Sequence, residues 1–169
     1  MTYLLAEREP KLRIRGLDAD PMQLKAATKK VAAIRNQISF QQGYAQQLPG
    51  NAQTFDIVVS SLFFHHLTTN QKREALAEIL RVLKPGGRLY IADWEKPSSG
   101  IQRLMFFIVQ LLDGFETTRD SVEGILPNLM KETGFSEVEN GRFVPTFLGT
   151  VRFFQAKKPP KQPNTMLMN

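Results

Sequence analysis

Hydrophobic positions along the chain follow two alternating periods. Apolar residues three and four positions apart predict helices, and short β-branched or alternating runs predict strands. The predicted strands cover residues 12–17, 37–41, 55–59, 88–92, 137–139 and 150–156. The predicted helices cover residues 3–6, 21–34, 70–83, 101–112 and 121–133. Strands that alternate with helices of about 10–15 residues predict an α/β fold with a mainly parallel sheet.

Local patterns add detail at three places. Asp20 followed by Pro21 predicts an N-cap and the first residue of a helix. The helix ending near Leu83 is predicted to begin behind a cap formed by Thr69 or Asn70. The run at 55–59 is almost continuously apolar and β-branched, which predicts a strand buried on both faces.

The end of the chain differs in composition from the rest. From Lys157 onward it is rich in Lys, Pro, Gln and Asn, which predicts a disordered tail at 158–169. Residues 1–157 are then predicted to form one domain, in agreement with a total length of 169 residues.

Composition and charge exclude several classes of function. The chain has no Cys, so it contains neither disulfides nor cysteine nucleophiles. Its net charge of +6 is spread along the sequence without a basic run, and no nucleic-acid partner is predicted. No secretory signal opens the chain, and the most apolar window, 104–112, is far shorter than the roughly 20 residues of a membrane span. The protein is predicted to be cytoplasmic, without a membrane span.

Polar residues follow the predicted strands at the points where these end. They are Asp18, the group Gly43-Tyr44-Ala45, the pair Ser60-Ser61, and Asp93 with Trp94. Ligands of open α/β sheets bind outside the carboxyl ends of the strands. A carboxylate at such an end, Asp18, can accept two hydrogen bonds from the vicinal hydroxyls of a ribose, although it could equally be a simple turn aspartate.

Three segments carry a resemblance to a known family. They are Gly16–Pro21, Phe55–Leu62 with His65-His66-Leu67, and Leu83–Ile91. In their order and spacing the chain resembles the class I S-adenosylmethionine-dependent methyltransferases, in the branch related to ubiquinone/menaquinone methyltransferases. The resemblance implies a Rossmann-like, seven-stranded sheet with an antiparallel last strand, and S-adenosylmethionine as the cofactor bound along the strand tips.

The resemblance also implies a set of cofactor contacts. Asp18 would hold the ribose hydroxyls, and Ala19 would flank the adenosine. Tyr44 and Ala45 would lie beside the adenine, although the family usually has an acidic residue in place of Tyr44. The pair Ser60 and Ser61 would face the methionine part of the cofactor and its methyl group.

The acceptor side of the site is expected near His65, His66 and Asp93. Imidazole titrates in the range useful for a base, although both histidines could instead pack or cap a turn. Two adjacent histidines without a third ligand do not predict a metal site. Asp93 and Trp94 lie where the resemblance places residues near a small-molecule acceptor, although Asp93 could equally cap the following turn and Trp94 could simply pack. The apolar segment 101–115 is either core or a lid over an apolar acceptor.

One part of the family pattern is missing. The fold expects a glycine-rich turn about 20 residues before the acidic strand end, but the chain contains no Gly-x-Gly, and 17 residues precede Asp18. The first strand and its cofactor loop are therefore predicted to be absent, through truncation or a misassigned start. Unpaired strand edges would result, closed by another segment, by a second chain or by self-association.

Two other functions remain open. The chain could be an inactive fragment or interaction subunit that binds no cofactor. An NAD-dependent dehydrogenase would also use Asp18 for its ribose, but the Tyr-x-x-x-Lys pair of its short-chain members is absent, since Tyr3, Tyr44 and Tyr90 precede Glu7, Leu48 and Trp94 by four residues.

Overall fold

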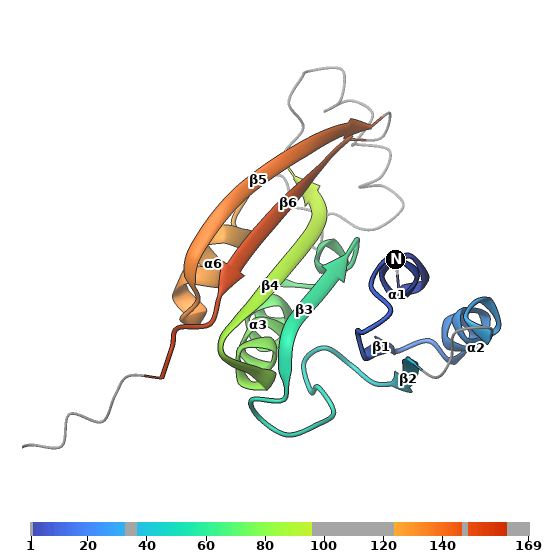
Figure 1. Ribbon diagram of the computed structural model, residues 1–169. Helices are drawn as coiled ribbons and strands as arrows, with labels where there is room; N and C mark the ends of the chain where they lie inside the picture. The colour runs from blue at the N-terminus through green and yellow to red at the C-terminus, as the bar shows by residue number, and fades with distance from the viewer. Residues whose placement is uncertain (1, 33–36, 96–123, 147–148, 162–169) are drawn as a thin grey trace, which may run out of the picture. The chain divides into compact units, whose positions relative to one another are not determined.

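The computed structural model describes residues 2–32, 37–95, 124–146 and 149–161 (Figure 1). The chain divides into two compact units, Met1–Pro49 and Gly50–Asn169, and each is described by itself. Within the described ranges, no helix combines the length and the apolar character needed to cross a membrane. The predicted helix at 101–112 and the segment 101–115 lie outside the described residues.

The first unit is a small α/β layer. Its elements are α1 (Thr2–Arg8), β1 (Ile14–Asp18), α2 (Pro21–Lys30) and β2 (Ile38–Gln42). Strands β1 and β2 pair in parallel, with Asp18 opposite Gln42 at their carboxyl ends. Its core joins both helical segments to the strands through Ala6, Val31 and Ile38. A side chain at Gly16 would meet the Phe40 ring at 2.5 Å, so the glycine lets the strands share this core.

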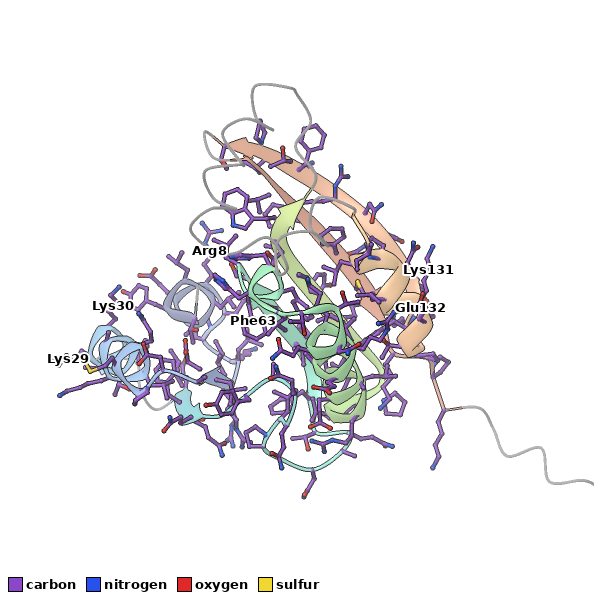
Figure 2. All side chains as sticks on the ribbon, turned by 180° about the vertical axis from the view of Figure 1, so that it is seen from behind. Arg8, Lys29, Lys30, Phe63, Lys131 and Glu132 are labelled. Atoms are coloured by element: carbon purple, nitrogen blue, oxygen red, sulfur yellow. The ribbon has the colours of Figure 1, made fainter. Side chains whose placement is uncertain are left out.

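Local sequence signals set the helix ends of this unit. Asp20 caps α2 as predicted, because its carboxylate accepts the Met22 backbone N–H at 2.7 Å. Basic side chains occupy the last turns of both helices, where their positive charge interacts favourably with the negative end of the helix dipole. These are Arg8 of α1 and Lys29 and Lys30 of α2, all labelled in Figure 2.

The second unit is a mixed sheet with helices on one face. Its elements are β3 (Phe55–Ser61), the 3₁₀ turn η2 (Phe64–His66), α3 (Thr69–Val82), β4 (Leu83–Glu95), α6 (Leu126–Thr133), β5 (Ser136–Thr146) and β6 (Gly149–Lys157). The strand order is β3-β4-β6-β5. Strand β3 runs parallel to β4, whereas β6 is antiparallel to both neighbours, which confirms the predicted antiparallel last strand.

The core of the second unit lies between this sheet and the pair α3 and α6, which contact each other (Figure 1). Fully buried side chains come from all three elements and include Leu76, Leu89, Ile91 and Met130. Helix α6 ends at Gly134, whose φ of 107° is the left-handed conformation that glycine adopts without strain. The prediction that Gly134 closes this helix is confirmed.

The predicted cap of α3 is wrong by one or two residues. Thr68, rather than Thr69 or Asn70, is the N-cap. Its hydroxyl accepts the Gln71 N–H, and the Gln71 side chain accepts the Thr68 N–H at 3.0 Å. This capping box satisfies two helix-end donors at once, which a cap at Thr69 or Asn70 could not do with Gln71.

The prediction that β3 is buried on both faces is also wrong. Its side chains alternate, and Ile57 and Val59 are 49% and 39% exposed while Val58 between them is half-buried. Successive strand residues point to opposite faces, and α3 and α6 cover one of these. In the described part of the chain, β3 pairs with β4 alone and β1 pairs with β2 alone.

The end of β6 is anchored to the start of β4. Lys158 forms two backbone hydrogen bonds, to Gly86 and Gly87, and its Nζ donates to the carbonyls of Leu80 and Leu83 at 2.7 and 2.8 Å. Burial lowers the pKa of this ammonium group. Order therefore extends into the first residue of the segment for which the composition predicts a tail.

Candidate cofactor and acceptor site

Asp18 stands at the carboxyl end of β1, with its side chain exposed. Its Oδ1 accepts the Asp20 backbone N–H at 2.9 Å, which orients the carboxylate at the turn into α2. Among the described residues, no donor reaches Oδ2. An oriented, solvent-facing carboxylate with one uncommitted oxygen can accept hydrogen bonds from a ligand hydroxyl.

A side chain not expected from the sequence, Gln42, joins the two strand ends of this unit. Its Nε2 donates to the Ala19 carbonyl at 3.0 Å, across the ends of the parallel pair. The Gly43 N–H donates to the Asp18 carbonyl at 3.1 Å beside it. These contacts hold the Asp18-Ala19 turn against the start of the loop after β2. In the sequence, Gln42 directly precedes Gly43 at the end of a predicted strand, and this position could have indicated a contact at the strand end.

Tyr44 and Ala45 lie in the loop that follows β2. Tyr44 is 67% exposed, and its carbonyl accepts the Gln47 N–H, which closes a turn around the pair. Because β1 and β2 are parallel, this loop begins at the same end of the sheet, the carboxyl end of its strands, as Asp18. The structure therefore brings the four predicted adenosine-side residues of the first unit to one edge.

Ser60 and Ser61 end β3 in the second unit. They pair with Ile91 and Ala92 of β4, and Ser61 is exposed. The next residue, Leu62, has a φ of 50°, and its N–H donates to the Ala92 carbonyl at 2.8 Å. A left-handed leucine is strained, and such strain is found where the surrounding structure holds a turn in place.

A buried carboxylate lies at the end of β4, beside this turn. Asp93 is 1% exposed. Its Oδ2 accepts the backbone N–H groups of Phe63 and Phe64 at 3.0 and 2.6 Å. Its Oδ1 contacts Nδ1 of His65 at 2.6 Å and accepts the Trp94 N–H at 2.8 Å. Phe63, labelled in Figure 2, follows the carboxyl end of β3. The sequence had not indicated that these backbone groups would meet Asp93.

The structure separates the three predicted acceptor-side residues. His65 and Asp93 are buried against each other, whereas His66 is exposed. The two imidazole rings are 3.9 Å apart between centroids, and the Trp94 ring lies 6.4 Å from that of His65. His66 is therefore the exposed histidine of the two, and its ring contacts the ring of the buried His65.

The fold and these strand ends define a class of protein, and the comparisons with known proteins agree. Residues 1–91 match the family model described as a methyltransferase domain. The chain belongs to this family, as a class I methyltransferase of the branch related to the ubiquinone/menaquinone enzymes. Membership implies S-adenosylmethionine as the cofactor.

Two relatives and one solved structure define the similarity. The chain is 36% identical over 102 residues to a demethylmenaquinone methyltransferase of Deinococcus radiodurans, covering 60% of this chain and 42% of the relative. It is 30% identical over 154 residues to a demethylmenaquinone methyltransferase of Thermus thermophilus, covering 80% of this chain and 69% of the relative. A methyltransferase structure from Methanosarcina mazei shares the fold, with a TM-score of 0.67, 18% identity, and coverage of 87% of this chain and 82% of that one.

The residues present fit this cofactor in chemical type. Asp18 has an uncommitted carboxylate oxygen, which can accept a hydrogen bond from a hydroxyl such as those of a ribose, and the exposed Tyr44 has an aromatic ring, which can stack on a base such as adenine. Ser61 offers a hydroxyl at the end of β3. The chain spans less than half the length of the first relative and about two thirds of the second.

Proposed function

We propose that this chain binds S-adenosylmethionine and contributes to the transfer of its methyl group to a small, apolar acceptor of quinone type. The single observation that carries the proposal is the oriented, exposed carboxylate of Asp18 at the end of a parallel strand, in a chain of this family. The relatives named as demethylmenaquinone methyltransferases support the acceptor class.

The roles proposed for the cofactor residues follow from the resemblance to the family. Asp18 accepts hydrogen bonds from the ribose hydroxyls, and Ala19 lies along the adenosine. Tyr44 and Ala45 contact the adenine, while Ser60 and Ser61 contact the methionine part. The exposed carboxylate, phenol and hydroxyl groups of this set are hydrogen-bonding partners for those parts of the cofactor.

The chemistry requires few protein groups. The bound sulfonium supplies an activated methyl group, so the protein must align the acceptor with it and exclude water. An acceptor that carries a proton on the reacting atom would also need a protein group to receive that proton. His66, with its exposed ring, is the proposed receiver of that proton.

A calorimetric titration tests the proposal against the alternative of a cofactor-free interaction subunit. S-adenosylmethionine and S-adenosylhomocysteine are titrated into the wild-type chain, Asp18→Ala and Asp56→Ala. We expect Asp18→Ala to weaken binding about tenfold or more, the loss expected from a charged hydrogen-bonding group. Asp56 is the matched control, because it is an exposed carboxylate paired with Lys84 at the other end of β3. Failure of the wild type to bind either ligand at millimolar concentration would favour the interaction subunit.

We also propose that the chain self-associates through its strand edges. The exposure of Ile57 and Val59 on β3 favours this, because an apolar edge strand is a template for further pairing. Light scattering over a concentration series should show a species larger than 19.2 kDa that Val59→Lys reduces to the monomer. A wild type that is monomeric throughout the series would contradict it. The absence of a nucleic-acid partner and the cytoplasmic location stay predictions.

A further inference from the structure

The buried carboxylate of Asp93 has four hydrogen-bond partners, two on each oxygen. Two backbone N–H groups reach Oδ2, and His65 and the Trp94 N–H reach Oδ1, all within 3.0 Å. The two oxygens therefore have separate tasks. Oδ2 holds the backbone that follows β3, and Oδ1 holds an imidazole together with the end of β4. Buried charges persist when such contacts replace their hydration.

Leu62 lies between Ser61 and the two residues, Phe63 and Phe64, whose N–H groups Asp93 binds. Leu62 is left-handed and 45% exposed, so neither its backbone conformation nor burial of its own side chain favours the turn it makes. The next two N–H groups along the chain are those bound by Asp93. The carboxylate thus compensates for the strain at Leu62 and determines the direction in which the chain leaves the end of β3.

The same carboxylate fixes the two histidine rings. Both oxygens of Asp93 accept backbone N–H groups, so Nδ1 of His65, 2.6 Å from Oδ1, is assigned as a further donor to this carboxylate. The buried ring is thereby held in one orientation. The exposed ring of His66 packs on it at 3.9 Å between centroids. A sequence of contacts runs from Asp93 through His65 to His66.

We propose that Asp93 and His65 are positioning residues for methyl transfer: they fix the 61–66 segment, so that the Ser61 end of β3 and the exposed His66 ring are held in the geometry the bound cofactor and acceptor require. The inference rests on the proposed function. In the proposed role, neither residue contacts the reacting atoms. Asp93 acts through the backbone of Phe63 and Phe64, and His65 acts through its Nδ1 proton.

Three substitutions test these roles by affinity for S-adenosylhomocysteine. Asp93→Asn retains one acceptor oxygen but turns an NH₂ group toward one pair of donors, so half of the contacts are lost. His65→Asn places an amide NH₂ near the position of Nδ1 and retains the donor, whereas His65→Gln places it near Nε2. We expect Asp93→Asn and His65→Gln to weaken binding about tenfold, since small displacements of a binding group have effects of this size, and His65→Asn to stay within about threefold of the wild type.

Two further measurements separate positioning from general destabilisation. Ile79→Val removes a methylene group from the core of α3, distant from the strand ends in sequence, and should lower the melting temperature without changing the affinity. Amide exchange in Asp93→Asn should be faster at Phe63 and Phe64 or at Trp94, whichever N–H groups face the new NH₂ group, and all three should keep wild-type protection in Ile79→Val. Both results support the proposal together with the affinity pattern above.

The outcomes distinguish this inference from the proposed function. If the wild type binds no S-adenosylhomocysteine, the proposed function fails. If the wild type binds and Asp93→Asn binds equally well, the pair is merely structural and the positioning role is overturned while the function stands. If His65→Asn is as defective as His65→Gln, His65 acts through Nε2 and its assignment as a positioning residue is wrong.

Discussion

Two aspartates at the carboxyl ends of parallel strands have opposite environments. Asp18 ends β1 with an exposed carboxylate, one oxygen of which accepts a single backbone N–H. Asp93, near the end of β4, is 1% exposed and has four donors on its two oxygens. The same side chain at equivalent topological positions therefore has hydrogen-bonding capacity for a ligand in one case and none in the other.

The difference shows how to assign roles at such a sheet edge. A carboxylate that retains an accessible oxygen can bind a ligand, whereas one whose oxygens are all satisfied by its own chain can only shape its surroundings. Position at a strand end predicts neither outcome. Substitutions at Asp93 should accordingly lower stability and disturb local geometry, and weaken binding through that disturbance, whereas substitutions at Asp18 should change ligand affinity with little effect on stability.

The largest effect on stability is expected for Asp93→Ala. It leaves three backbone N–H groups and the His65 ring without their acceptor, and two of these donors are buried. We expect the free energy of unfolding to fall by about 3 kcal/mol, measured by urea denaturation. Asp56→Ala, which removes an exposed carboxylate, should change it by about 0.5 kcal/mol or less. Equal stability of Asp93→Ala and wild type would remove the distinction between the two aspartates.

A smaller effect is expected at Asp20, a third aspartate in the same turn as Asp18. Its carboxylate caps α2 through the Met22 N–H, so Asp20→Ala should cost about 1 kcal/mol of stability. Asp20→Ser retains a capping oxygen and should restore most of this. Affinity for S-adenosylhomocysteine should stay unchanged in both variants, because the backbone N–H that orients Asp18 is retained. A loss of affinity in Asp20→Ser would assign Asp20 a ligand contact.

The smallest effect is expected at Gln42. Removal of its bond to the Ala19 carbonyl should leave the free energy of unfolding within about 1 kcal/mol of wild type, since one exposed hydrogen bond is lost. The affinity for S-adenosylhomocysteine should fall about threefold, because the Asp18-Ala19 turn is less well held. Gln41→Ala, at the neighbouring exposed position of β2, is the control. Equal affinity of Gln42→Ala and Gln41→Ala would show that the bond does not support the site.

Features predicted correctly from the sequence depend on neighbouring residues. The Asp20 cap, the Gly134 helix end and the strand ending at Asp18 each follow from a few adjacent side chains. The Thr68 cap could have been found in the same way, because Gln71 follows it three residues later and completes a capping box.

Features that depend on distant residues could not be predicted. Burial of β3 depends on which faces of the sheet other elements cover. The continuous apolar run predicted burial on both faces, but Ile57 and Val59 are exposed. His65 and Asp93 are separated by 28 residues and meet because β3 and β4 pair in one particular register. The sequence made both candidates for the acceptor side, but burial and hydrogen-bond partners, which distinguish them from His66, are properties of the folded chain.

The central claim is that Asp18 binds the ribose hydroxyls of S-adenosylmethionine or its product. The most direct measurement is a thermodynamic cycle in which S-adenosylhomocysteine and its 2′,3′-dideoxy analogue are titrated into wild type and Asp18→Ala. Loss of the hydroxyls should weaken binding to the wild type about tenfold and should have little further effect in Asp18→Ala, since the two groups interact with each other. Equal losses in the two proteins would contradict the assignment and place the ribose contact elsewhere.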